Sequence, residues 1–204
     1  HETNDDDEVL VLLALTNSTA FKQLLLLVVG FFAFQTGPMS SIPIPKMEEP
    51  RRNDLIRIAK SAWFHKLSLD SVCETSHAFL LPAKLRARLG DFEFDSFENE
   101  LYNLQVEVDE IAFDLYGFSD IDRAAAVEAS GSTNEVESDI LEGSDDREDG
   151  DGVDMVDQTD GILSWATGVA FGRFDWRLAT GERASPPEPD PFDPLPAKSP
   201  GMLP

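Results

Sequence analysis

FENELYNLQVEVDEIAFDLYGFSDIDR, residues Phe97–Arg123, is the stretch that decides the fold class of this chain. Its main apolar residues follow one another at intervals of 4, 3, 4, 3 and 4. This spacing draws a single apolar stripe along a helix of about five turns. The stripe consists of Phe97, Leu101, Leu104, Val108, Ile111 and Leu115. Gly117 predicts the left-handed end of this helix, and Ser119 with Asp122 predicts the start of a shorter one. The pattern therefore favours a mainly helical chain.

The N-terminal part combines short apolar runs with chain breaks. Val9–Leu15 is wholly apolar, so it is either a buried strand or the start of a helix. The polar residues Asn17–Thr19 predict a helix start ahead of an apolar element over Phe21–Phe34. The Gly37–Pro38 pair predicts a break, and the alternating prolines of residues 42–45 predict extended backbone. These features indicate a small α/β remnant at the start of the chain.

Leu24–Phe34 is the only run that suggests a membrane segment. It has 11 residues, whereas a helix that crosses a bilayer needs about 20. Lys22 interrupts any extension toward the preceding apolar run, and the acidic start of the chain does not fit a signal peptide. We therefore expect a buried element and no association with a membrane.

Two further helices are predicted before the central one. The first starts at Asn53 or Asp54 and runs through Leu67, with apolar residues on one side. The second falls within residues 76–89, where Pro82 is expected to kink or restart the helix. The chain between residues 51 and 128 is therefore interpreted as a helical domain.

The C-terminal part changes character twice. Ser130–Asp160 is acidic and poor in apolar residues, which is typical of a disordered linker. Ile162–Phe174 is predicted as a final apolar helix, in which Gly168 and Gly172 indicate close packing against another helix. Ser185–Pro204 is rich in proline and is expected to form an extended tail that wraps another part of a larger protein.

The charge of the chain opposes independent binding to nucleic acid. The net charge is −23 and the pI is about 4.2, whereas Lys and Arg supply most of the affinity for phosphates. The charge is unevenly distributed, since nine basic and five acidic residues lie between Lys46 and Arg88. The composition therefore still allows membership of a larger DNA-binding protein.

Signals for metal or redox chemistry are weak. The single Cys73 cannot form an internal disulfide, which fits a reducing cytoplasm. His65 and His77 lack a second histidine at helical spacing. In the acidic run Asp145–Asp157, a calcium-loop frame places Val156 where a bidentate acid is needed. We therefore predict neither a metal site nor a catalytic residue in this chain.

Four segments, in order along the chain, resemble parts of large adenine-specific DNA methyltransferases, the type IIG restriction–modification and BREX-type phage-defence enzymes. Leu12–Phe21 followed by Phe34–Pro45 is similar to the end of a TaqI-type specificity domain, which closes on the sequence Ile-Pro-Ile-Pro. Ala59–Leu81 resembles the helical segment that follows that domain. Phe97–Arg123 resembles a helical region that lies near the specificity domain. Leu163–Arg177 resembles a stretch further downstream in the same enzymes.

The resemblance implies a domain organisation and a function. It identifies residues 1–50 as the end of a TaqI-like target-recognition domain, 51–128 as a helical domain, 129–160 as an acidic linker and 161–204 as an apolar helix with a proline-rich tail. It further implies a cytoplasmic fragment of a site-specific adenine-N6 DNA methyltransferase. The fragment would help to position DNA and to recognise the target, while the missing catalytic core, expected before His1, would be its partner.

The catalytic motifs of such enzymes are absent from this sequence. S-adenosylmethionine binds at a Gly-rich turn after a strand, whereas Gly150–Gly152 follows an acidic run. A [DNS]-P-P-[YFW] loop stacks its aromatic side chain on the flipped adenine, whereas Ser185–Glu188 has a glutamate at that position. No cofactor is therefore expected in this chain, and S-adenosylmethionine is implied for the parent protein only.

Two interpretations remain for the exposed residues. In the first, a basic cluster contacts DNA phosphates and sets register; it consists of Lys46, Arg51, Arg52, Arg57 and Lys60. The same residues also fit an ordinary solvated helix face. In the second interpretation, the chain is an acidic helical interaction module without enzymatic activity, which binds a protein partner through the Phe97–Leu115 stripe. A peripheral membrane role fits less well, because anionic lipids repel the net negative charge.

Overall fold

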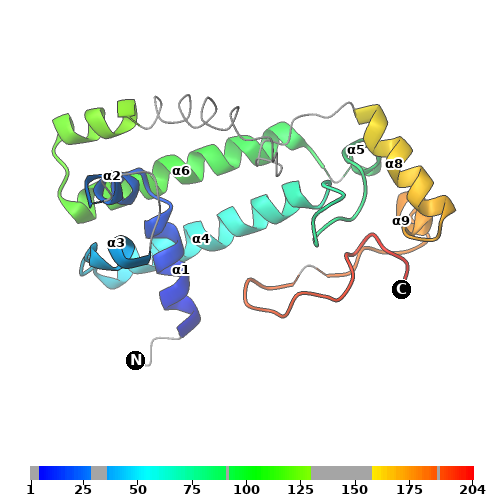
Figure 1. Ribbon diagram of the computed structural model, residues 1–204, viewed down its shortest axis with the longest axis horizontal. Coiled ribbons are helices and arrows are strands. Elements are labelled where there is room, and N and C mark those ends of the chain that lie inside the picture. Colours follow the sequence, from blue (N-terminus) through cyan, green and yellow to red (C-terminus); the bar gives the residue numbers. More distant parts are fainter. Residues whose placement is uncertain (1–4, 29–35, 91, 130–157, 188) are drawn as a thin grey trace. The chain divides into compact units, whose positions relative to one another are not determined.

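The structure, a computed structural model, describes residues 5–28, 36–90, 92–129, 158–187 and 189–204 (Figure 1). The labelled helices are α1 (Asp5–Thr16), α2 (Thr19–Val28), α3 (Thr36–Ser41), α4 (Glu49–Asp70), α5 (Ala83–Leu89), α6 (Phe94–Tyr116), α8 (Gln158–Ala170) and α9 (Trp176–Thr180). An additional helix spans residues 120–129. The described part is mainly helical, as predicted, and its only β-type pairing is an isolated bridge between Phe174 and Met202.

The chain divides into two compact units. Unit 1 consists of residues 1–61 and 102–150, and unit 2 consists of residues 62–101 and 151–204. α4 and α6 each supply residues to both units. The units therefore interleave along the sequence, whereas the predicted domain boundaries follow one another in chain order.

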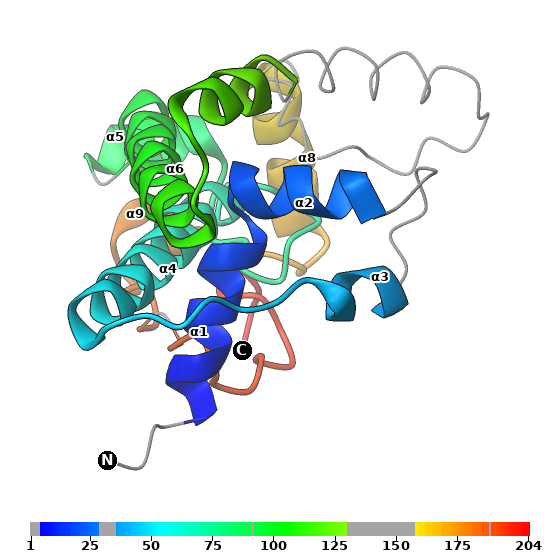
Figure 2. The same ribbon diagram turned by 90° about the vertical axis from the view of Figure 1, so that its left-hand side faces the viewer.

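The N-terminus of unit 1 is helical where a small α/β remnant was expected. Val9–Leu15 lies inside α1, and no strand occurs within the described residues 5–28 and 36–90. Four acidic residues in the first turn of α1 favour a helix start. A short apolar run does not by itself distinguish a strand from a helix, which explains the error. α1 and α2 follow each other with a bend of 74° (Figure 2).

The predicted break at the Gly37–Pro38 pair is wrong, because both residues lie in the short helix α3. Proline is tolerated in the first turn of a helix, where its missing N–H has no helical partner to lose. Ile42 follows this helix and packs with Phe21 and Leu25 in a buried cluster, on which Tyr116 also packs. This cluster joins α2 to the end of α6 in unit 1.

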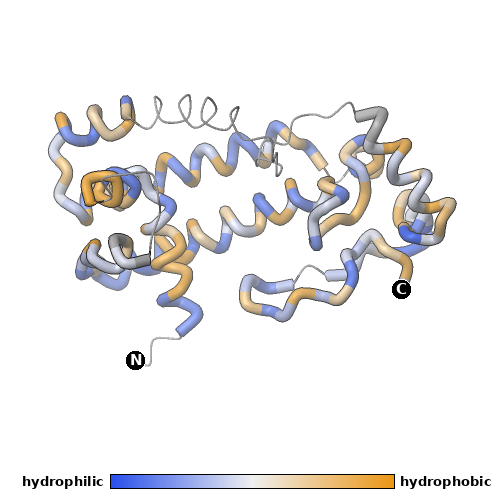
Figure 3. Tube along the Cα trace, in the orientation of Figure 1, coloured by the Kyte–Doolittle hydropathy of each residue, from blue (hydrophilic) through white to orange (hydrophobic). Residues whose placement is uncertain are grey.

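Apolar residues dominate α1 and α2 (Figure 3). In the described part of the chain, no single helix combines the length and the apolar character of a membrane span, and α1 with α2 reaches them only as a bent pair. The predicted apolar element over Phe21–Phe34 forms a helix as far as Val28, and residues 29–35 lie outside the described part.

The central helix α6 confirms the strongest sequence prediction. Of its apolar stripe, Leu104 and Val108 are buried, together with Ala112 and Phe113. Gly117 has a φ of 72°, and the Phe118 N–H donates to the Phe113 carbonyl over 3.0 Å. This backbone bond closes the helix, and the two phenyl rings pack 5.2 Å apart, centroid to centroid.

The helix over residues 120–129 begins as predicted. The Ser119 N–H donates to Asp122 Oδ2 over 3.1 Å, and the Asp122 N–H donates to Ser119 Oγ over 3.3 Å. The reciprocal pair satisfies two backbone donors at the helix start. Hydrogen bonds from Ser119 hold the pKa of Asp122 below its usual range.

The other two predicted starts need correction. α4 begins at Glu49, so the cap expected at Asn53 or Asp54 is wrong. Pro50 lies in the first turn of the helix, a position that proline favours. Pro82 restarts a helix as predicted, but only Ala83–Leu89 is helical and residues 76–81 form turns and irregular backbone. α5 ends at Gly90, as expected, with a φ of 80°.

The last apolar helix is shifted toward the N-terminus. α8 starts at Gln158, inside the segment predicted as an acidic linker, and ends at Ala170. The remainder of that segment, residues 130–157, lies outside the described part. The described residues of 182–204 contain no helix, which agrees with their proline content. The end of this tail binds back to Phe79, Arg173 and Asp175 of unit 2. Its expected contact with another part of a larger protein stays a prediction.

Candidate functional site

The five basic residues predicted to contact DNA lie just before α4 or within its first twelve residues, in unit 1. Successive residues of a helix are rotated by about 100°, so Arg51 and Lys60 point about 180° apart around the helix axis. The helix therefore does not bring all five cations to one face.

Two arginines of this cluster join α4 to α6. Arg51 Nη2 lies 3.2 Å from Asp114 Oδ2, and Arg57 pairs with Glu107. Arg123 Nη2 also reaches Asp114, at 2.7 Å. The hydrogen bond from Arg123, supported by that from Arg51, holds the pKa of Asp114 below its usual range. These guanidinium groups are already engaged with carboxylates of unit 1.

The remaining three cations differ in their surroundings. Arg52 has a side chain only 15% exposed, and its Nη1 lies 2.9 Å from Glu8 Oε1 of α1. Lys46 and Lys60 are exposed, and neither has an ion pair within the described part of unit 1. They are therefore the two members of the cluster with a charge available to an external phosphate.

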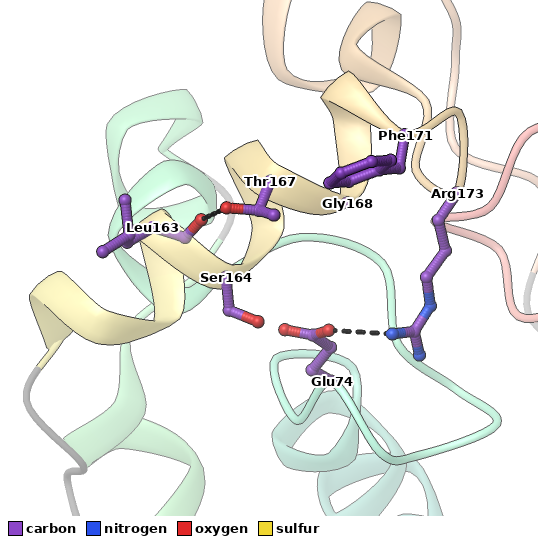
Figure 4. A pocket seen from close by; sticks show the side chains of 7 residues that line it. All are labelled: Glu74, Leu163, Ser164, Thr167, Gly168, Phe171 and Arg173. Atoms are coloured by element: carbon purple, nitrogen blue, oxygen red, sulfur yellow. Dashed lines mark hydrogen bonds and ion pairs between the residues drawn. The ribbon is translucent and has the colours of Figure 1, made fainter.

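Sequence reasoning missed a pocket of about 510 Å³ in unit 2. It lies between one face of α8 and the loop that follows α4 (Figure 4). Its lining residues are Glu74, Leu163, Ser164, Thr167, Gly168, Phe171 and Arg173. The loop residue stands about ninety positions before the others in the sequence, so only the tertiary fold brings them together.

The polar side of the pocket is an ion pair. Arg173 Nη1 lies 3.2 Å from Glu74 Oε1, and both side chains keep partial access to solvent. The Arg173 guanidinium also lies over the ring of Phe174, 4.7 Å from its centroid. Figure 4 shows the Ser164 hydroxyl directed toward the Glu74 carboxylate. This side can donate to and accept from a polar ligand.

The apolar side follows one face of α8 and continues into the turn after it. Leu163 and Phe171 are 66% and 86% exposed, and Thr167 lies between them at the same helical spacing. Thr167 Oγ1 donates to the Leu163 carbonyl over 2.8 Å, so its hydroxyl hydrogen is used within the helix. An exposed apolar stripe beside an ion pair suits binding. The spacing of residues 163, 167 and 171 was the available sequence signal.

The wall behind the pocket depends on Gly168. A Cβ atom at this position would overlap the ring of Phe174, which packs against α8 there. The Phe174 ring also lies 5.1 Å from the Phe79 ring. The predicted role of Gly168 in helix–helix packing is therefore replaced by contact with an aromatic ring, while Gly172 caps α8 with a φ of 75°.

A buried carboxylate organises the chain after α8. Asp175 is fully buried and caps α9, accepting from the Arg177 N–H over 3.1 Å. The Arg177 side chain adds two hydrogen bonds of 2.8 and 2.7 Å, and Arg183 Nη1 adds one of 2.9 Å. These hydrogen bonds, those from Arg177 foremost, hold the pKa of Asp175 well below its usual range.

Gly201 locks the tail to the same place. Its N–H donates to the Phe79 carbonyl over 2.8 Å, and its carbonyl accepts from the Asp175 N–H over 2.9 Å. A Cβ atom on Gly201 would overlap the carbonyl of Leu80. The tail therefore approaches the backbone of residues 79–80 so closely that only glycine fits at position 201.

The stripe proposed for partner binding is largely occupied within the chain. Leu104 and Val108 are buried in unit 1, and Phe97 packs with His65 and Phe92 in unit 2. Among the described side chains, no group of three or more His, Cys, Asp or Glu residues could hold a metal ion. Comparison with protein-family models, curated proteins and solved structures gives no match.

Proposed function

We propose that this chain is a non-catalytic, helical part of a site-specific adenine-N6 DNA methyltransferase of a restriction–modification or phage-defence system. In this proposal, the catalytic core binds S-adenosylmethionine and transfers the methyl group. This chain supports target recognition and positions the DNA, and the complete enzyme works in the cytoplasm. The observation that carries the proposal is that the segments resembling such enzymes pack against one another within each unit.

In unit 1, the two parts of the first resembling segment meet. Phe21 ends one part and Ile42 belongs to the other, and both are buried in the same cluster with Leu25. Tyr116, from the segment that resembles the nearby helical region, packs on this cluster. These segments therefore belong to one folded element.

In unit 2, the remaining two segments meet in the same way. Phe79 and Phe174 are both buried and their rings pack 5.1 Å apart. The ion pair between Glu74 and Arg173 joins the same two segments. Packing chemistry accounts for most of the resembling residues, which suits a supporting role better than a catalytic one.

The charges limit how this part could contact DNA. Lys46 and Lys60 are exposed, whereas Arg51, Arg52 and Arg57 pair with acids of unit 1. Against a net charge of −23, two exposed lysines give little non-specific affinity. In the proposal, they set register on DNA that the catalytic core already holds.

The test begins with the reading frames on both sides of this one. The complete locus is expressed in a bacterial host that lacks adenine methylation, and N6-methyladenine is mapped by single-molecule sequencing. We expect a frame with a Gly-rich cofactor turn and an N-P-P-[YF] loop, and methylation at one sequence that disappears when this frame is deleted.

The control replaces the aromatic residue of the N-P-P-[YF] loop in the core and must abolish methylation with this chain intact. A locus without a methyltransferase frame would remove the proposal. Methylation that keeps its level and its target after deletion of this frame would remove it as well.

A further inference from the structure

The proline-rich tail of unit 2 is fixed at both ends. On the N-terminal side, Arg183 binds Asp175 and donates to the Met202 carbonyl over 3.1 Å. On the C-terminal side, Gly201 binds Phe79, and the bridge pairs Met202 with Phe174. Lys198 Nζ donates to the Leu203 carbonyl over 3.1 Å. The tail of unit 2 therefore turns back on itself between these anchors (Figure 1).

The proline loop, defined as residues 189–197, projects between these anchors. It contains four prolines in nine residues, and most of its side chains are exposed. The Asp193 N–H donates to the Asp190 carbonyl over 3.0 Å, and the Asp190 N–H donates to Asp193 Oδ2 over 3.0 Å. This turn places Pro191 and Phe192 at its centre, with proline at the position that favours it.

Two large apolar side chains of the proline loop face solvent. Phe192 is 46% exposed and Leu195 is 71% exposed. They stand three residues apart, with Phe192 at the centre of the turn and Leu195 between the two prolines that follow it. Asp190 and Asp193 flank Phe192 and are both exposed. The loop therefore presents two exposed apolar side chains with acidic neighbours.

We propose that the proline loop is a docking segment for a partner protein that has an aromatic-lined groove bordered by basic side chains. Grooves of this kind bind proline-rich segments because little conformational entropy is left to lose. Anchoring at Arg183 and Gly201 lowers this cost further, since it restricts the loop before the partner arrives. The acidic flanks match the basic border and exclude acidic partners. This inference does not depend on the proposed function.

The experiment uses the full chain in its native host. Ala197→p-benzoylphenylalanine places a photo-crosslinker two residues after Leu195, and mass spectrometry identifies the crosslinked protein and residue. That protein is then purified, and its affinity for the full chain is measured by titration calorimetry at low and high salt.

Two double variants separate the loop from the rest of unit 2. Phe192→Ala with Leu195→Ala removes the proposed anchors and should weaken binding at least about tenfold. Leu163→Ala with Phe171→Ala removes a Leu and a Phe that are also exposed, but in the pocket, and should leave the affinity for the crosslinked protein unchanged. Circular dichroism checks that both variants keep the helical content of the wild type.

Support requires a crosslink to an aromatic-lined groove, loss of affinity in the loop variant alone, and weaker binding at high salt. Crosslinking only to a second copy of this chain, with a concentration-dependent mass in ultracentrifugation, would replace the proposal by self-association. Sensitivity to the pocket variant alone, or the absence of any specific crosslink, would overturn it.

Discussion

The ring of Phe174 occupies the space that a Cβ atom on Gly168 would need. Gly168→Ala should therefore push this ring away from α8 and from its buried contact with Phe79. Overpacking of this kind costs about 1–3 kcal/mol of unfolding free energy. Urea denaturation followed by circular dichroism measures the change.

Gly161→Ala is the matched control, because Gly161 lies in the same helix and a Cβ atom there meets no atom within 4 Å. Alanine is favoured over glycine inside a helix by roughly 0.5–1 kcal/mol, so this variant should be slightly more stable than the wild type. Equal effects of the two substitutions would contradict the packing of Phe174 on Gly168.

The buried carboxylate of Asp175 predicts a stability that depends on pH. Its pKa in the folded chain is well below the usual range, because Arg177 and Arg183 donate to the charged form. This stabilisation is fully present above the pKa of an unfolded aspartate, about 4, and is lost as the pH falls toward the folded-state value. Asp175→Asn should lower the urea midpoint at pH 7, and its difference from the wild type should shrink below pH 4.

The comparison uses urea midpoints of both proteins between pH 3 and pH 8. Asp54→Asn is the control, since Asp54 is exposed on α4, and it should follow the wild type at every pH. A constant difference between Asp175→Asn and the wild type over this range would show that the charge on Asp175 does not stabilise its contacts with Arg177 and Arg183.

Asp109 of α6 caps a different helix, α2. Its two carboxylate oxygens accept from the Thr19 N–H over 2.6 Å and from Thr19 Oγ1 over 2.8 Å. A negative charge at a helix N-terminus is favourable, so Asp109→Asn should cost about 0.5–2 kcal/mol of unfolding free energy. Glu110→Gln, its exposed neighbour, should change this value by less than about 0.5 kcal/mol. Thermal and urea unfolding of both variants decide the prediction.

The proposed function predicts a specific change in salt dependence. In the complete methyltransferase, log affinity falls as log salt concentration rises. Lys46→Gln with Lys60→Gln should make this negative slope shallower by about 2, because two phosphate contacts disappear. Arg57→Gln should leave the slope nearly unchanged, because Arg57 pairs with Glu107. Fluorescence anisotropy with a duplex containing the target measures both. An unchanged slope in the double lysine variant would exclude these contacts.

The parts of the fold that could be predicted from sequence depend on local chemistry. Gly117 and the pair Ser119 and Asp122 act within a few residues of themselves, and the structure shows the helix end and the helix start that they predict. Two predictions were wrong because the first turn of a helix accepts proline. At the Gly37–Pro38 pair, proline was interpreted as a helix breaker. At Asn53 or Asp54, the helix start was placed too late because Pro50 was not considered as part of the first turn.

The candidate site could not be predicted, for a physical reason. The pocket joins Glu74 to Arg173, and nothing near either residue in the sequence specifies that pair. The burial of Asp175 and the close approach of Gly201 to Leu80 likewise depend on tertiary packing. Only the spacing of exposed apolar residues along α8 was readable beforehand.

The contact between Thr19 and Asp109 spans ninety residues, and this separation has a consequence for synthesis on the ribosome. α1 and α2 leave the ribosome long before α6. Until α6 emerges, Thr19 has no Asp109 to accept its hydrogen bonds, and Tyr116 does not yet pack on Phe21 and Leu25. Contacts between distant residues delay folding, and apolar surface that waits for them aggregates readily. The nascent chain should therefore need a chaperone until α6 has been made.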